Sequence, residues 1–342
     1  MRILVIRTSS MGDVALTTPV LKDMREQYPK IELLLLTMET FLPIFSAIKG
    51  LLFFFPDFHR RHSGIIGLAR LYKDIRSMGK INYVIDLHDV LRSKILRFFF
   101  KINGIPMSVI DKGRSEKKYV INGKKKVQLK HTVERYRDVF VNAGYKIRPS
   151  QGIYIIPSDE AATGIQKMIV LSDDLNIGVA PYSKHDLKMW PEEYMISLLR
   201  MISEKYKSKF WLFGGKDERD RLSAFQDKVK GSYSVAGRLN LEEELALISK
   251  LDFMIAMDSA NMHMAALSGT KVVSIWGGTD PLVGFGAWQQ PDEFSFRISV
   301  QELTCRPCTV FGKGRCRRRD FACMVWLTPD KAFERMIRLK IF

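Results

Sequence analysis

Four charged residues stand just beyond predicted strands, where the chain passes toward the next helix: Asp13, Lys188, Glu218 and Asp258. Asp258 begins a helix-like stretch. The free N–H groups at such a helix start can hold a phosphate, while the adjacent carboxylate binds sugar hydroxyls. Lys188 precedes the segment WPEE, where it can meet a diphosphate, and Glu218 can bind ribose hydroxyls. These residue types indicate a site for phosphate and sugar groups.

Each of the four residues also has an ordinary structural explanation. Asp258 and Asp13 belong to a favoured type of helix-capping residue. Lys188 and Lys184 can form a solvated pair, and Glu218 can complement the positive end of a helix dipole. The turn around Asp13, TSSMGD, has too few glycines for a dinucleotide fingerprint and lacks the Lys-Ser/Thr pair of a P-loop. The residues alone therefore leave a structural role and a binding role open.

Apolar runs alternate with helix-like stretches along most of the chain. The runs show no alternation of apolar and polar residues, as expected for strands that are covered on both faces. Such a series predicts an α/β fold with mostly parallel sheets. The predicted strands are RILVIR, IELLLLT and NYVIDLH in the first half, and NIGVA, KFWLF, DFMIAM and KVVSI in the second; the clearest predicted helices cover residues 14–28, 64–78, 191–206 and 328–342.

The pattern breaks between Arg148 and Asp159 and then starts again, which divides the chain into two similar halves. A chain of 342 residues is long for one core, so two domains are expected. We predict a first domain at 1–155, a second at 156–328, and a terminal helix at 329–342 that packs back toward the first domain. Doubly wound halves of this kind bind ligands in a crevice at the carboxyl ends of their strands.

Four segments carry a distinctive combination of motifs: MRILVIRTSSMGDVALTTPVL, KMWPEEYMISL, LFGGKDE and AMDSANMHMAALSGTKVVSIWGGTDP. In their order and spacing they resemble the heptosyltransferases of glycosyltransferase family 9. The resemblance implies a GT-B fold, in which two Rossmann-like domains face a central cleft and bind the acceptor and the nucleotide-sugar donor. It also implies an inverting transfer of heptose from ADP-heptose to a lipopolysaccharide inner-core acceptor, with no metal or other cofactor required for catalysis.

The resemblance also implies roles for single residues. Asp13 is similar to the catalytic base, and Lys188 to the ligand of the donor diphosphate. Glu218 is similar to a ligand of the nucleoside ribose, and Asp258 to a ligand of the donor sugar. The other expected site residues are Ser183, Ser259, Ala260 and His263 on the donor side, and Ser10, Gly12, His88 and Arg92 on the acceptor side.

Two positions depart from the family pattern. The glycine that usually follows DS or DT is Ala260, and the usual FGPTDP reads WGGTDP, with Gly278 in place of a proline. Ala260 narrows the space beside the phosphate and Gly278 removes a turn proline, while every catalytic group stays in place. A family member with another nucleotide-sugar donor and another glycan acceptor is therefore the alternative among enzymes.

The chain is strongly basic, with 54 lysines and arginines against 37 acidic residues and a net charge of +17. This charge favours polyanionic partners: nucleic acid, a phosphorylated glycolipid or an anionic membrane surface. Arg92, Lys94, Arg97 and Lys101 alternate with apolar residues in LRSKILRFFFKI, which suits a membrane surface as well as a core helix with a solvated edge. A second basic tract, RSEKKYVINGKKK, is predicted to be a loop. A nucleic-acid-binding protein is the alternative from another class, although the sequence has no recognisable reader motif.

The four cysteines lie close together in the sequence, at Cys305, Cys308, Cys316 and Cys323. Their intervals of two, seven and six residues allow a structural metal cluster, local disulfides or reduced thiols. The first residues are typical of a buried strand rather than a secretory signal, and the most apolar stretch, FLPIFSAIKGLLFFFPDF, is interrupted by proline, glycine and lysine. We therefore expect a cytoplasmic protein that contacts the inner face of the bacterial inner membrane peripherally, with no nucleic acid among its partners.

Overall fold

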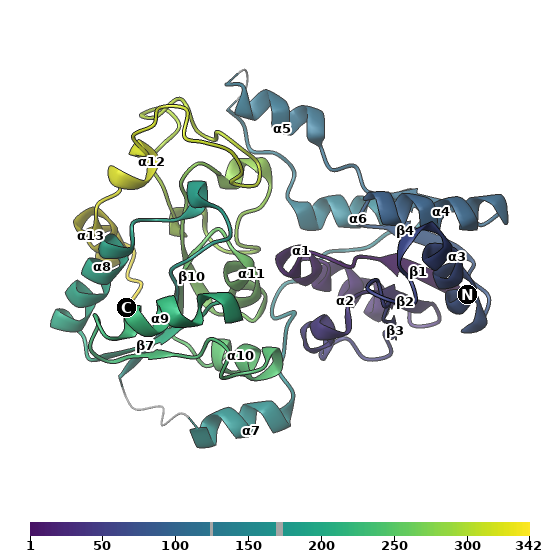
Figure 1. Cartoon of the computed structure of the whole chain (residues 1–342), viewed down its shortest axis with the longest axis horizontal. Helices are drawn as coiled ribbons and strands as arrows, with labels where there is room; N and C mark the ends of the chain where they lie inside the picture. The colour runs from purple at the N-terminus through teal and green to yellow at the C-terminus, as the bar shows by residue number, and fades with distance from the viewer. Residues whose placement is uncertain (124–125, 169–173) are drawn as a thin grey trace. The chain divides into compact units, whose positions relative to one another are not determined.

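The computed structural model describes residues 1–123, 126–168 and 174–342 (Figure 1). The chain forms two compact units. Unit 1 contains residues 1–112 and 132–154, and unit 2 contains residues 113–131 and 155–342. The main division lies where the sequence pattern breaks, but the segment 113–131, which we expected in the first domain, groups with unit 2.

Unit 1 is built on a five-stranded parallel sheet with the strand order β3-β2-β1-β4-β5. In β1 and β2 the last four residues are apolar and buried, as a strand covered on both faces requires. The strands are β1 (Arg2–Ile6), β2 (Glu32–Leu36), β3 (Leu52–Phe54), β4 (Tyr83–Asp86) and β5 (Met107–Val109). The helices are α1 (Met11–Ala15), α2 (Thr18–Gln27), the 3₁₀ helix η1 (Glu39–Phe45), α3 (Gly64–Ser77), α4 (Leu91–Ile102) and α6 (Thr132–Asn142).

The helix that we predicted at residues 14–28 is interrupted and forms the separate helices α1 and α2. Pro19 lies in the first turn of α2 and has no N–H to donate to the carbonyl of Ala15. The Thr18 hydroxyl donates to that carbonyl instead, at 2.8 Å, and the Thr17 hydroxyl donates to Val14 O at 2.7 Å. The chain therefore turns between the two helices without leaving these carbonyls unsatisfied.

Unit 2 is built on a six-stranded parallel sheet with the order β11-β10-β9-β6-β7-β8. Its strands are β6 (Leu175–Ala180), β7 (Ser208–Leu212), β8 (Ser232–Ser234), β9 (Phe253–Met257), β10 (Lys271–Ile275) and β11 (Ser295–Phe296). Its α-helices are α5 (Arg114–Ile121), α7 (Asp159–Met168), α8 (Glu192–Lys205), α9 (Arg219–Gln226), α10 (Leu241–Ile248), α11 (Ala260–Leu267), α12 (Ala322–Val325) and α13 (Pro329–Arg338). Its 3₁₀ helices are η2 (Asp186–Lys188), η3 (Lys216–Glu218), η4 (Pro281–Val283) and η5 (Asp292–Phe294).

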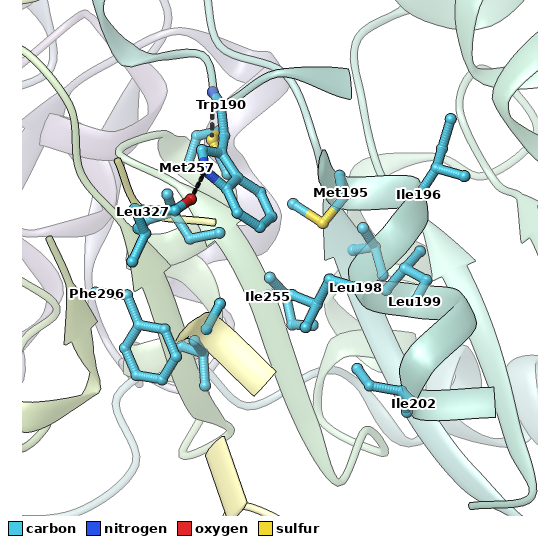
Figure 2. Packing of buried hydrophobic residues seen from close by; sticks show 14 of the residues in the cluster. Trp190, Met195, Ile196, Leu198, Leu199, Ile202, Ile255, Met257, Phe296 and Leu327 are labelled. Carbon is cyan, nitrogen blue, oxygen red and sulfur yellow. Dashed lines mark hydrogen bonds between the residues drawn. The ribbon is translucent and has the colours of Figure 1, made fainter. Parts of the chain in front are cut away.

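The core of unit 2 holds the segment that follows Lys188. Trp190 is buried in a cluster of apolar side chains from α8 and from strands such as β9 (Figure 2). Its indole N–H lies 2.9 Å from the carbonyl of Leu327, and its backbone N–H lies 3.4 Å from the sulfur of Met257. A buried indole with a hydrogen-bond partner has one preferred orientation. Trp190, two residues after Lys188, thus holds the backbone of the Lys188 turn in place.

The terminal helix α13 packs on α8, within its own unit. Thr328 caps the helix by accepting the N–H of Lys331. Beyond the helix, Phe342 stacks on Tyr206 with ring centroids 4.3 Å apart. These contacts attach the terminal segment to unit 2, and the packing toward the first domain that we expected for residues 329–342 stays a prediction.

The second basic tract, residues 114–126, was predicted to be a loop, but it contains the helix α5. Val120 is buried in an apolar cluster with Leu129 and Val283, and the ammonium of Lys117 lies 4.3 Å from the ring centroid of Phe285. These contacts attach most of the second basic tract to unit 2; its residues 124 and 125 lie outside the described residues. None of the described helices is long and apolar enough to span a membrane.

Candidate active site

Lys188 and Asp258 form an ion pair in unit 2. The ammonium nitrogen of Lys188 lies 2.8 Å from Oδ2 of Asp258, and the hydroxyl of Thr279 donates to the same oxygen at 2.8 Å. The Asp258 carboxylate is almost fully buried, whereas the Lys188 side chain remains partly exposed. The structure thus brings together two predicted donor-side residues and adds Thr279, which the sequence did not single out.

The start of helix α11 lies directly after Asp258. Ser259 is the N-cap residue, and its hydroxyl oxygen is buried without a hydrogen-bond partner among the described residues. Ala260 is the first helical residue, and His263 is buried one turn further along. The Ser183 hydroxyl donates to the carbonyl of Asp258 at 3.3 Å. Unsatisfied N–H groups and a positive dipole at a helix start suit an anionic group, and the Ser259 hydroxyl can add to such a site.

Gly278 connects the Lys188 turn to the loop after β10. Its N–H donates to the carbonyl of Leu187 at 2.7 Å, and its own carbonyl accepts the N–H of Cys308 at 2.7 Å. A proline at this position would have no N–H to donate. Gly278 therefore forms a backbone hydrogen bond here that a proline cannot form.

The buried side chain of Arg306, which no sequence motif singled out, holds the loop after β10 in place. Its guanidinium is fully buried, donates to the carbonyls of Gly277 and Thr279, and lies 3.3 Å from a carboxylate oxygen of Asp280. Burial lowers the pKa of Arg306, and the charge of Asp280 opposes that shift. A buried arginine that satisfies several carbonyls fixes the backbone around it. Arg306 thereby holds Thr279, which in turn donates to Asp258.

Glu218 lies apart from the Lys188–Asp258 pair. It ends the 3₁₀ helix η3 after β7, and its Oε2 accepts the backbone N–H of Gly215 at 2.8 Å. This contact completes the turn, which is the ordinary structural role considered above. This hydrogen bond uses Oε2 only, and the residue is half-buried. Glu218 can therefore complete the turn and bind a ligand as well.

Asp13 forms the corresponding ion pair in unit 1. Its Oδ2 lies 2.8 Å from a guanidinium nitrogen of Arg7 and accepts the hydroxyl of Ser10 at 2.8 Å. Arg7 is buried and also donates to the carbonyl of Leu87 at 2.7 Å. Ser10 is the N-cap residue of α1 and Gly12 is buried in its first turn, so Asp13 does not cap the helix. The sequence signal for Arg7 was its place at the end of the first apolar run.

His88 lies beside the same turn. Its two ring nitrogens lie 3.1 Å from the Thr8 hydroxyl and 3.3 Å from the Ser9 hydroxyl. Burial and the neighbouring charge of Arg7 lower the pKa of His88 to about 4. His88 is thus neutral at physiological pH and can only donate or accept hydrogen bonds there. Arg92 lines a small cavity together with His88 and stacks over Phe58 at 4.5 Å.

The cysteine loop, residues 305–323, lies against the donor-side residues. All four cysteines are free thiols, and burial raises the pKa of Cys308 and of Cys323 to about 11. Among the residues that the structure describes, no three histidine, cysteine or acidic side chains are gathered as a metal site. At Gly312 an added Cβ would lie 2.7 Å from Cγ of Lys188. The loop therefore packs on the stem of Lys188.

A sequence family model matches most of the chain. It describes glycosyltransferase family 9 (heptosyltransferase) and matches residues 68–310, well over half of the chain. The chain belongs to glycosyltransferase family 9. The family resemblance drawn from the motifs is confirmed, and the protein is a transferase.

Relatives of this family 9 transferase extend over nearly its whole length. Lipopolysaccharide heptosyltransferase 1 of Pseudomonas aeruginosa is 24% identical over 335 residues, which cover 90% of this chain and 86% of the relative. The family 9 glycosyl transferase of Veillonella parvula has a TM-score of 0.79 at 19% identity, with 99% of this chain and 96% of that chain covered. The heptosyltransferase WaaC of E. coli, solved with ADP-2-deoxy-2-fluoro heptose, has a TM-score of 0.66 at 20% identity and covers 99% and 100%. The predicted α/β fold of the GT-B class is confirmed.

Proposed function

We propose that this family 9 transferase moves heptose from ADP-heptose to a lipopolysaccharide inner-core acceptor, with inversion at the anomeric carbon. The observation that carries the proposal is the Lys188–Asp258 pair at the start of α11, where an anionic group and a sugar can be held together. The names of the Pseudomonas aeruginosa and E. coli relatives support the choice of heptose and of ADP.

The donor diphosphate binds Lys188 and the first N–H groups of α11. Lys188 has a flexible stem and a partly exposed ammonium, so it can turn from Asp258 toward a phosphate oxygen without leaving the pair entirely. Asp258 then offers carboxylate oxygens to the sugar hydroxyls, and Glu218 binds the nucleoside ribose. As the bond between the sugar and ADP breaks, Lys188 and the helix start stabilise the negative charge on the departing diphosphate. These groups supply the charge that a metal ion supplies in other transferases, so no cofactor is proposed.

Asp13 acts as the general base on the acceptor hydroxyl. Arg7 and Ser10 contact Oδ2 of Asp13 and so orient the carboxylate, and an oriented carboxylate can take the proton of the acceptor hydroxyl. The acceptor oxygen attacks the anomeric carbon while ADP leaves from the opposite side, which gives inversion. His88, neutral at physiological pH, provides hydrogen bonds on the acceptor side together with Arg92.

The acceptor is anionic and linked to lipid, so the enzyme works at the cytoplasmic face of the inner membrane through peripheral contact. Ala260 at the start of α11 favours one alternative, which is another nucleotide-sugar donor. Its methyl group stands where the family usually has glycine, next to the N–H groups that would meet the phosphate.

The test is direct transfer with defined substrates. The purified protein is incubated with a deacylated inner-core acceptor and either ADP-heptose or a panel of other nucleotide sugars. The product is identified by mass spectrometry, and its anomeric configuration is read by NMR. We expect heptose transfer with inversion, in the presence of EDTA as well. Transfer from another nucleotide sugar but not from ADP-heptose would replace the proposal by its alternative.

A further inference from the structure

Helix α4 of unit 1 has two apolar faces. One face, with Leu96 and Phe100, is buried against the core of the unit. On the opposite face, Leu91, Phe98 and Ile102 are 74%, 58% and 62% exposed. These three residues are spaced by seven and four positions, so they form a single line along the helix. An exposed apolar line opposite a buried one has no role in folding the unit.

Basic residues border this exposed line. Lys94 and Lys101 are exposed on one flank, and α4 contains no acidic residue. Arg97, which the sequence analysis grouped with them, belongs to the interior instead. It lies 3.1 Å from carboxylate oxygens of both Asp86 and Asp89, and its side chain is only 14% exposed. Lys94 also lies 3.9 Å from Asp89, but its side chain is 52% exposed. The surface charge of α4 therefore comes from Lys94, Lys101 and Arg92.

Helix α3 extends the surface, because it packs beside α4 (Figure 1). Ile65 and Ile66, in its first turn, are 69% and 72% exposed. Arg70 and Lys73 are exposed further along the helix. The acidic residue of α3, Asp74, is paired with Arg61 at 2.7 Å. Together the two helices present five large exposed apolar side chains among cations; we name this the α3–α4 surface.

We propose that the α3–α4 surface docks on an anionic phospholipid bilayer. The inference rests on the proposed function, which brings the enzyme to a lipid-linked acceptor, and it assigns the contact to these two helices. Helices that lie in a membrane interface insert an apolar face to the depth of the acyl boundary and place lysines and arginines at the headgroups. The line of Leu91, Phe98 and Ile102 with the lysine flank meets both requirements, since each lysine adds attraction to anionic lipid.

The experiment measures flotation of the full chain with lipid vesicles in a density gradient. Vesicles of phosphatidylcholine alone are compared with vesicles that also contain phosphatidylglycerol. One variant combines Leu91→Gln, Phe98→Gln and Ile102→Gln, and a second combines Lys94→Gln and Lys101→Gln. We expect the parent to float with the anionic vesicles, and each variant to bind them on the order of tenfold more weakly. The buried face of α4 is unchanged in both variants, and circular dichroism checks that they are folded.

The matched control removes two charges elsewhere. Lys205→Gln with Lys230→Gln changes two exposed lysines of unit 2, so the net charge falls by the same amount as in the lysine variant. We expect this control to float like the parent. Equal flotation of all the variants would overturn the proposal, as would a parent that ignores lipid charge. A parent dimer that becomes monomeric in the apolar variant, seen by light scattering, would assign the surface to a second copy of the chain.

Activity on two forms of the acceptor separates this inference from the proposed function. With the water-soluble, deacylated acceptor, the variants should match the parent, because none of the five substituted residues belongs to the proposed donor or acceptor site and Arg92 is unchanged. With the intact lipid acceptor in vesicles, the apparent KM of the variants should rise roughly tenfold. If no protein acts on the soluble acceptor, the proposed function fails while the flotation result stands. If flotation is unchanged but transfer proceeds, the docking surface fails while the function stands.

Discussion

Each of the two units contains a carboxylate that contacts a cation and a hydroxyl, but the two units bury opposite members of the ion pair. In each, one carboxylate oxygen lies 2.8 Å from a cation and 2.8 Å from a hydroxyl: Asp258 with Lys188 and Thr279, and Asp13 with Arg7 and Ser10. In unit 2 the acid is buried and the lysine is partly exposed, whereas in unit 1 the arginine is buried and the acid is the more exposed partner. Under the proposed function, the more exposed member of each pair is the one that meets a ligand. The difference in exposure therefore fits a cation on the donor side and a base on the acceptor side.

The largest expected effect tests the exposed acid. Asp13→Asn keeps the shape of the side chain but removes the base. We expect transfer to fall by at least about a hundredfold, the usual scale for the loss of a general base, while ADP affinity stays within experimental error. Steady-state kinetics and calorimetry with ADP measure the two quantities. Weaker ADP binding together with normal turnover would reverse the roles of the two pairs.

The next effect tests the exposed cation. Lys188→Ala should weaken ADP binding by roughly tenfold to a hundredfold and slow transfer as well, because a charged hydrogen bond to the diphosphate is lost in the bound state and in the leaving group. Lys184→Ala removes an exposed lysine from the same loop and serves as the matched control. If the two variants bind ADP equally well, Lys188 is an ordinary surface lysine.

A smaller effect tests the buried cation of unit 1. Arg7→Lys keeps the charge but loses the planar fork that contacts Asp13 and the Leu87 carbonyl together. Turnover should fall about tenfold with little change in ADP affinity, since the base remains but is less well oriented. Steady-state kinetics measures kcat, and calorimetry measures the ADP dissociation constant separately. A loss confined to ADP affinity would contradict a positioning role for Arg7.

The smallest effect concerns acid stability, to which each unit contributes one histidine with a clearly lowered pKa. Burial lowers the pKa of His88 and of His131 to about 4, from an ordinary value of 6.5. As the pH falls below about 6.5, these two histidines become protonated in the unfolded chain but stay neutral in the folded chain. The free energy of unfolding therefore falls with pH until about pH 4, where the folded chain binds the protons as well. His88→Gln and His131→Gln should each remove part of this loss, on the order of 1 kcal/mol between pH 7 and pH 5. Urea unfolding of parent and variants at the two pH values checks the slopes, and identical slopes would exclude neutral buried histidines.

The sequence predicted the elements whose signal is local. Runs such as Ile3–Ile6 are apolar because both faces of a parallel strand are covered, and that pattern is visible without the fold. The short strands β3 and β5 were missed, since three residues carry too little pattern. The break between α1 and α2 was also missed, although Pro19 is its sequence signal. The packing of α13 depends on which unit covers its apolar face, and that information lies outside the helix.

The residues of the candidate site likewise fall into those that the sequence revealed and those that only the structure revealed. Asp13, Lys188 and Asp258 could be found because each lies in the loop or turn that follows a predicted strand. Of their partners, Arg7 had one sequence signal, its place at the end of the first apolar run, whereas Thr279 and Arg306 become relevant only through contacts across loops. Arg306 is 27 residues away from Thr279 in the chain and meets its carbonyl at 3.0 Å. Spacing in a sequence does not encode such a contact.

Gly278 has a consequence for how this donor site tolerates change during evolution. One residue joins the turn of Lys188 to the cysteine loop through two main-chain hydrogen bonds, each 2.7 Å long. Main-chain links of this kind survive most exchanges of the side chains around them, which suits a family whose members differ as much as 24% identity implies. Proline is the exchange that would sever one of them. The link between the two loops therefore depends on the backbone at Gly278 and not on the side chains around it, so most side chains in the two loops can be exchanged independently of each other.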